Sequence, residues 1–153
     1  MKVCVWGTFD FFHKGHKSLI DKAISTAGKD GFVYIGLATG DLIKNKNILY
    51  TFDERKKSIE KHLREKDFLK KAKIVPIENK YGLTLIEDYD AIVVSPETEK
   101  IAREINIKRK ENGKSPLKIV KIPYVLSQDK KPISSTRIKK GVIKKNGEII
   151  SED

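Results

Sequence analysis

Two histidines close to the N-terminus are the residues of this chain best suited to chemistry. His13 and His16 lie three positions apart, and His16 is in phase with Leu19 and Ile20, which begin an apolar stripe at helical spacing. The apolar run Val3–Trp6 before them indicates a buried strand. We therefore expect a strand, a tight turn and a helix, with both imidazoles facing inward where the helix begins.

The start of a helix favours an anion. Its first N–H groups lack partners within the helix, and the peptide dipoles place a partial positive charge there. Two imidazoles at that position, with Gly7 and Gly15 letting the backbone come close, suit a phosphate. Two surface histidines or half of a metal site are the alternative interpretations, and the strand–turn–helix context favours the phosphate. No set of protein ligands for a metal is predicted.

The sequence around these histidines resembles a known signature. Gly-Thr-Phe-Asp at 7–10, followed by His-x-Gly-His at 13–16, is similar to the signature of the nucleotidyltransferase superfamily. Members of that superfamily transfer a nucleoside monophosphate from ATP or CTP to a phosphate or, in a few cases, to a carboxylate. The resemblance implies that the phosphate expected at the helix start belongs to a nucleotide.

The remainder of the chain alternates strands and helices. Apolar runs predict four further strands, at residues 32–38, 73–77, 91–95 and 117–122. Helix starts are predicted at the capping box Thr51–Glu54, at Pro96 and within 132–141, with a short helical turn at 82–87 and a polar loop at 39–50. His62, on the helix that begins at the capping box, is expected as a surface or boundary residue.

This alternation predicts an α/β fold. We expect a Rossmann-like, doubly wound, five-stranded parallel sheet of order 3-2-1-4-5 with helices on both faces. Ligands of such sheets bind beyond the carboxyl ends of the strands where the order reverses, here between strands 1 and 4. The loops at that point carry the histidine motif and Ser95–Thr98, and Ser134–Thr136 follows strand 5 nearby. The fold and the motifs therefore predict a ligand site at the same place, beyond the carboxyl ends of strands 1 and 4.

The composition predicts a single domain over residues 1–153, with 142–153 as a short, loosely held tail. Charged residues make up 35% of the chain and no apolar run is long enough to span a bilayer, so we expect a cytoplasmic protein without a membrane partner. The net charge of +11 comes from lysines interleaved with acidic residues and without aromatic residues among them, so nucleic acid is not an expected partner. Cys4 is expected as a buried thiol, and a homo-oligomer is compatible with the sequence.

A second segment extends the resemblance. Ile133–Ile138 is similar to the Ile-Ser-Ser-Thr element of the superfamily, whose helix start holds the β- and γ-phosphates. Together with Ser95–Glu99 it resembles the archaeal type of pantetheine-phosphate adenylyltransferase. That resemblance implies the reaction of ATP with 4′-phosphopantetheine to give dephospho-coenzyme A and pyrophosphate, with Mg²⁺ bridging the ATP phosphates. Nicotinamide mononucleotide, flavin mononucleotide or glycerol phosphate as the acceptor, CTP as the donor, and a binding module without turnover stay open as alternatives.

The resemblance also implies roles for individual residues. His16 is expected at the α-phosphate and transition state, His13 at the β-phosphate or bridging oxygen, and Thr8 with the Phe9 backbone at the reacting phosphates, beside Gly7. The terminal phosphates are assigned to Ser134, Ser135 and Thr136, with Lys139 in the place of a phosphate-binding arginine and Arg137 as its alternative. The acceptor is assigned to Thr8 and Lys46, with Lys44 as the near alternative, and Ser95 occupies the place of an arginine found in bacterial relatives.

Overall fold

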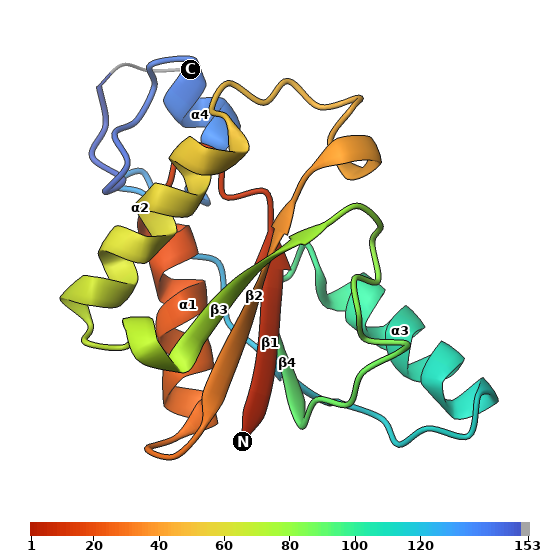
Figure 1. Ribbon diagram of the computed structural model, residues 1–153. Helices are drawn as coiled ribbons and strands as arrows, with labels where there is room; N and C mark the ends of the chain where they lie inside the picture. Colours follow the sequence, from red (N-terminus) through yellow and green to blue (C-terminus); the bar gives the residue numbers. More distant parts are fainter. Residues whose placement is uncertain (151–153) are drawn as a thin grey trace.

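The computed structural model describes residues 1–150, a five-stranded parallel sheet flanked by helices (Figure 1). The strand order is β3-β2-β1-β4-β5, as predicted. The strands are β1 (Lys2–Gly7), β2 (Phe32–Ala38), β3 (Ala72–Ile77), β4 (Ala91–Val94) and β5 (Lys118–Lys121). The helices are α1 (Lys14–Ala27), α2 (Phe52–Glu65), α3 (Glu99–Glu111) and α4 (Ser135–Lys139), with short 3₁₀ helices at Gly40–Leu42 and Leu69–Lys71.

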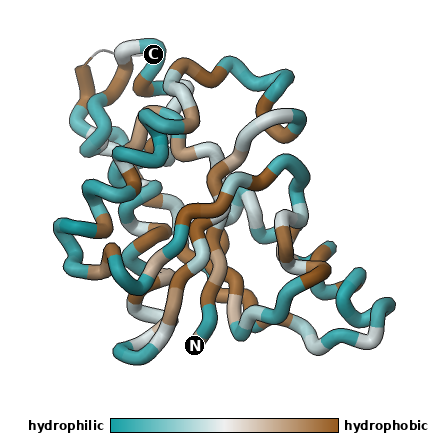
Figure 2. Tube along the Cα trace, in the orientation of Figure 1, coloured by the Kyte–Doolittle hydropathy of each residue, from teal (hydrophilic) through white to brown (hydrophobic). Residues whose placement is uncertain are grey.

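Alternation along the strands divides the apolar residues between the two faces of the sheet. On β1, Val3 and Val5 pack in the cluster with α1 and α2, whereas Cys4 and Trp6 belong to the cluster with α3. Figure 1 shows α1 and α2 on one side of the sheet and α3 on the other. Figure 2 shows hydrophobic segments concentrated in the central strands and hydrophilic ones along the outer helices. The predicted Rossmann-like α/β class is therefore confirmed.

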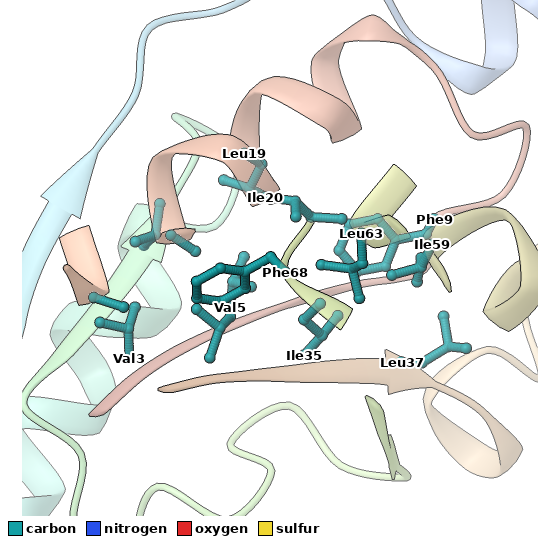
Figure 3. Packing of buried hydrophobic residues seen from close by; sticks show 14 of the residues in the cluster. Val3, Val5, Phe9, Leu19, Ile20, Ile35, Leu37, Ile59, Leu63 and Phe68 are labelled. Carbon is teal, nitrogen blue, oxygen red and sulfur yellow. The ribbon is translucent and has the colours of Figure 1, made fainter. Parts of the chain in front are cut away.

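The larger apolar cluster lies between the sheet and the helices α1 and α2 (Figure 3). Ile20 on α1 and Ile59 and Leu63 on α2 are buried with Val5 and Ile35 of the sheet. Each such side chain contributes about 1.5–3 kcal/mol when it leaves water. This packing fixes the position of α1 on the sheet, and with it the start of the helix that carries the two histidines.

The helix starts agree with the sequence at α2 and differ at α3. The predicted capping box is present in α2, where Thr51 Oγ1 accepts from the Glu54 N–H and Glu54 Oε1 accepts from the Thr51 N–H, both at 3.1 Å. In contrast, α3 begins at Glu99, three residues after the expected Pro96. The carbonyl of Ser95 accepts from the N–H groups of Thr98 and Glu99, which closes a turn before the helix. That turn follows directly on the carboxyl end of β4, which pairs with β1 in the sheet.

The prediction that His62 is a surface or boundary residue is wrong. His62 is only 4% exposed, and its Nε2 lies 2.7 Å from Asp21 Oδ1 on α1. The apolar stripe of α2 is wide enough to include this position, and the Asp21 carboxylate supplies the polar partner that a buried imidazole requires. The pair joins α1 to α2 close to the site.

The segment after α4 differs from the expected loosely held tail over its described part, residues 142–150. Val142 and Ile143 are buried beside Ile133, and an antiparallel bridge joins Ile143 to Ile149. The carbonyl of Lys145 accepts from the first N–H of α1 at 2.9 Å. The segment therefore closes over the histidine helix; residues 151–153 lie outside the described part. None of the helices within residues 1–150 is both long and apolar enough to cross a membrane.

Candidate active site

A cleft of about 760 Å³ opens at the corner that the sequence predicted, beyond the carboxyl ends of β1 and β4. Its volume lies within the range of small-molecule sites. The predicted residues that line it are Gly7, Thr8, Phe9, His13, His16, Lys46, Ser95, Ser134, Ser135, Thr136 and Lys139. Lys44 and Arg137 do not line it. The fold thus gathers most of the candidates from five segments of the chain.

The start of α1 is capped by the histidines themselves. His13 is the N-cap residue, and its Nδ1 accepts from the N–H groups of Gly15 at 3.0 Å and His16 at 3.4 Å. His16 Nδ1 in turn accepts from the His13 N–H at 3.2 Å. The Lys14 N–H donates to Lys145 and the Lys17 N–H to the His13 carbonyl. The expectation of unpaired helix N–H groups is therefore wrong, because all of these donors already have partners inside the protein.

This capping determines which nitrogen of each ring carries the proton. A neutral imidazole has one donor and one acceptor nitrogen, and in both rings Nδ1 accepts from a backbone N–H. Each Nε2 must therefore carry hydrogen and act as a donor. The two rings stack with centroids 3.6 Å apart, so the donors come from adjacent positions in the cleft. The site presents two neutral N–H groups to an anion.

Burial keeps both histidines neutral. It lowers the pKa of His13 from 6.5 to about 4, and it lowers the pKa of His16 well below 6.5, with the neighbouring His13 acting in the same direction. Protonation of His13 at Nδ1 would also place a hydrogen against the two N–H groups that it caps. Near neutral pH the pair can donate hydrogen bonds to a phosphate without taking up a proton.

The turn before α1 is held by aromatic packing and by Gly15. Phe9 and Phe11 have positive φ angles of 53° and 49°, which aromatic residues rarely adopt, and the Phe9 ring is 1% exposed. The rings of Phe9 and Phe12 lie 5.2 Å and 5.7 Å from that of His16. A Cβ at Gly15 would lie 2.9 Å from His13 Cε1, so glycine makes room for the ring here. These contacts fix the imidazoles before any ligand binds.

Asp10 connects this turn to the loop before α2. It is 2% exposed, and its carboxylate accepts from the N–H groups of Leu49 and Tyr50, both at 3.1 Å. The Lys139 ammonium lies 3.1 Å from Asp10 Oδ2 and also donates to the Asn47 carbonyl. Lys139 was predicted to hold ATP phosphates; part of its charge is instead committed to Asp10.

Arg55 is a second link that sequence reasoning missed. Only 2% exposed, it donates from Nη1 to the carbonyls of Thr8 at 2.9 Å and Ala38 at 2.8 Å, and from Nε to the Tyr50 carbonyl at 3.1 Å. Burial lowers the pKa of this guanidinium, and the Asp10 charge opposes that shift. Arg55 therefore joins the ends of β1 and β2 to the loop that carries Lys46. The sequence signal that could have pointed to Arg55 is its position directly after Glu54, the glutamate of the capping box.

The serine segment lines the cleft beside the turn that carries Asp10. Ser134 is the N-cap of α4 and accepts from the Arg137 N–H at 3.2 Å, and Ser135 Oγ donates to the Asp10 carbonyl at 2.6 Å. The Arg137 guanidinium turns away and pairs with Asp129 and Ser127. Arg137 was predicted as an alternative phosphate ligand. In the structure it holds the turn that contains Ser127 and Asp129. Lys140, which sequence reasoning did not select, lines the cleft.

Further cleft residues were not selected as site candidates, although Glu97, Thr98 and Ile133 lie within segments that the sequence analysis singled out. They are Trp6, Asn47, Ile48, Glu97 and Thr98, and, beyond β5, Ile122, Pro123, Tyr124, Val125 and Ile133. The second group gives the cleft an apolar end beside α4. No group of three or more histidine, cysteine, aspartate or glutamate side chains that could hold a metal ion occurs in residues 1–150.

Comparison with known proteins agrees with this geometry. The cytidylyltransferase-like family matches residues 4–141. A phosphopantetheine adenylyltransferase of Methanosarcina acetivorans is 42% identical over 99% of this chain and 97% of its own length, and one of Archaeoglobus fulgidus is 43% identical over 98% and 100%. The crystal structure of a protein with unknown function from Archaeoglobus fulgidus is similar to this chain with a TM-score of 0.72 at 39% identity, covering 80% of this chain and 89% of that one. The chain therefore belongs to the cytidylyltransferase-like family, within its group of archaeal phosphopantetheine adenylyltransferases.

Proposed function

We propose that the cleft binds ATP beside 4′-phosphopantetheine and transfers the adenylyl group, giving dephospho-coenzyme A and pyrophosphate. The chain is a nucleotidyltransferase, and its relatives named phosphopantetheine adenylyltransferase match it over nearly their whole length. The observation that carries the proposal is the pair of neutral imidazoles, which share one cleft with the serine segment of α4.

The reaction needs no covalent intermediate on the protein. An oxygen of the pantetheine phosphate attacks the α-phosphorus of ATP, the new P–O bond forms, and the bond from the α-phosphorus to the bridging oxygen breaks. Pyrophosphate leaves with that electron pair. Catalysis of such transfers rests on alignment and on donors aimed at the oxygens that gain charge.

The two histidines supply these donors. His16 Nε2–H donates to a non-bridging oxygen of the α-phosphate, and His13 Nε2–H donates toward the bridging oxygen or the β-phosphate. Because both rings are neutral and held by caps, they stabilise charge without reorganising. Thr8 lies beside them at the end of β1 and contacts the reacting phosphates.

The rest of ATP extends toward α4 and the apolar end of the cleft. Ser134, Ser135 and Thr136 face the terminal phosphates, with Lys139 and Lys140 supplying positive charge. The adenine lies against the segment 122–125, where the lining is apolar. Mg²⁺, if bound with ATP, takes oxygen ligands from the phosphates and neutralises their charge. The acceptor phosphate meets Lys46, Thr8 and Ser95.

To test this proposal, the purified protein is incubated with ATP or CTP and with each acceptor in turn, and the release of pyrophosphate is measured. We expect ATP with 4′-phosphopantetheine to turn over far faster than any other pair. Faster turnover with nicotinamide mononucleotide, flavin mononucleotide or glycerol phosphate would reassign the acceptor, and no turnover with any pair would indicate a binding module. Chelation of Mg²⁺ in the same assay tests the metal. A cytoplasmic location and the oligomeric state stay predictions.

A further inference from the structure

Trp6 lies where the cleft meets the α3 face of the sheet. It is the last side chain before Gly7 at the carboxyl end of β1, and it is the single tryptophan of the chain. Strand alternation places it on the face opposite Val5, in the apolar cluster with Ile92, Val94 and Ile101. Trp6 is half-buried and lines the cleft together with Ser95 and Thr98. It therefore links the acceptor side of the cleft to this apolar cluster.

One glycine makes room for Trp6, and a second lies against its ring. A Cβ at Gly36 of β2 would lie 2.8 Å from Trp6 Cβ, closer than real contacts allow, and a Cβ at Gly82 would lie 3.6 Å from Trp6 Cη2. Gly36 of the neighbouring strand thus leaves the space that the Trp6 side chain needs, and Gly82 packs against the edge of the ring. The position of the ring is set by this packing before any ligand is present.

The indole N–H is free to bind a ligand. Within residues 1–150 it donates no hydrogen bond, and it is not among the buried polar atoms that lack a partner. A tryptophan N–H that is fully buried normally finds a partner, and this one is reached by solvent because it is not fully buried. Trp6 thus offers one flat apolar face and one donor.

In-line transfer determines which substrate reaches Trp6. The attacking and leaving oxygens lie on opposite sides of the α-phosphorus, so the acceptor approaches from the side away from the pyrophosphate. The serine segment of α4 lies beside the turn before α1, because Ser135 Oγ donates to the Asp10 carbonyl, whereas Trp6 packs in the cluster with α3 and lines the cleft with Ser95 and Thr98. The organic part of the acceptor therefore extends toward Trp6.

We propose that Trp6 determines acceptor specificity by lining the path of the pantetheine arm. Its indole face packs against the methyl and methylene groups of the arm, and its N–H donates to one of the two amide carbonyls. A short acceptor such as glycerol phosphate reaches neither contact. This inference rests on the proposed function, since it names the part of that acceptor which this side chain recognises.

The single tryptophan allows binding to be measured apart from turnover. In wild-type protein, 4′-phosphopantetheine should change the tryptophan fluorescence in a saturable manner, whereas glycerol phosphate and inorganic phosphate should leave it nearly unchanged. ATP alone should have a small effect. A large change with ATP and none with 4′-phosphopantetheine would overturn the proposal and put Trp6 at the nucleotide.

Kinetics of variants supply the second readout. Trp6→Ala should raise KM for 4′-phosphopantetheine about tenfold and Trp6→Phe about threefold, with KM for ATP unchanged. Ile119→Ala, which loosens the same apolar cluster without lining the cleft, should change neither KM. If wild type is active but Trp6→Ala and Ile119→Ala behave alike, Trp6 only packs the cluster and the inference fails. If wild type is inactive with 4′-phosphopantetheine, the proposed function fails instead.

Discussion

The histidine turn (residues 8–16) and the lysine loop (residues 39–50) both contribute to the lining of the cleft and are held in different ways. In the histidine turn, burial, ring stacking and reciprocal capping fix His13 and His16. The lysine loop is largely exposed, and Asp10, Arg55 and Lys139 hold its end through charged hydrogen bonds. Packing therefore preorganises the histidine turn, whereas charged hydrogen bonds hold the end of the lysine loop.

The difference indicates how each region should respond to change. Groups fixed by packing act on a transition state without reorganising, so their loss should appear in kcat. Changes in the lysine loop, which charged contacts hold, should raise KM for the acceptor. Added salt should raise the same KM, because salt screens exposed charges. The variants below test this division.

The largest effect is expected for His16. His16→Ala removes a preorganised donor, so kcat should fall by roughly 10²–10³ while the chain stays folded. Lys17→Ala, at the next, exposed position of α1, is the matched control and should leave kcat unchanged. Pyrophosphate release and thermal unfolding measure both quantities. Near-normal activity with a collapsed melting temperature would mean that His16 is structural.

The histidine turn should also make stability depend on pH. The pKa of His13 is about 4 in the folded protein and 6.5 without burial, so the unfolded chain binds this proton first as pH falls. The free energy of unfolding should therefore fall from pH 6.5 to about 4, with His13 accounting for about 3 kcal/mol, and should be restored above pH 6.5.

His13→Asn separates this effect from general acid denaturation. Asparagine is a good N-cap without a titrating group, so the variant should lose the His13 share of the pH dependence and keep the helix start. Denaturant unfolding at both ends of that pH range measures the difference. An unchanged pH dependence in the variant would show that His13 is not the group responsible.

The fold was predictable because its signals are local or periodic. Apolar runs of the right length predicted all five strands, and the capping box located the start of α2. The strand order followed from right-handed crossovers. What failed depended on contacts between distant segments: the burial of His62 needs Asp21 on another helix, and the packing of residues 142–150 needs Ile133 and α1.

The site shows the same division between pattern and contact. The residues of the two motifs gather in one cleft as expected. The sequence could not show that the helix N–H groups of α1 are already capped, that Arg137 turns to Asp129, or that Arg55 reaches two strand ends. Each depends on side-chain directions that residue spacing does not determine.

Asp10 tests the electrostatic side of the comparison. Asp10→Asn keeps the shape but turns one acceptor into a donor that faces a backbone N–H of Leu49 or Tyr50, and it removes the partner of Lys139. We expect KM for the acceptor to rise about tenfold and the free energy of unfolding to fall by about 2–3 kcal/mol. Asp53→Asn, an exposed residue of α2, removes the same charge without these contacts. Equal effects of the two variants would contradict the role of Asp10 in holding the loop.

The smallest effect is expected for Lys46, which extends from the loop that Asp10 holds. Lys46 and Lys44 are both exposed, but only Lys46 lines the cleft, so the pair forms a matched comparison within one loop. An exposed lysine contributes a screened point charge, and Lys46→Ala should therefore raise KM for 4′-phosphopantetheine only about fivefold, with a modest fall in kcat and little change in KM for ATP. Lys44→Ala should change none of these. Added salt should raise the wild-type acceptor KM and narrow the gap to Lys46→Ala, because screening weakens the contact that the variant lacks. An acceptor KM in Lys46→Ala equal to wild type at low salt would remove Lys46 from the site and leave Lys139 and Lys140 as the cations of the cleft.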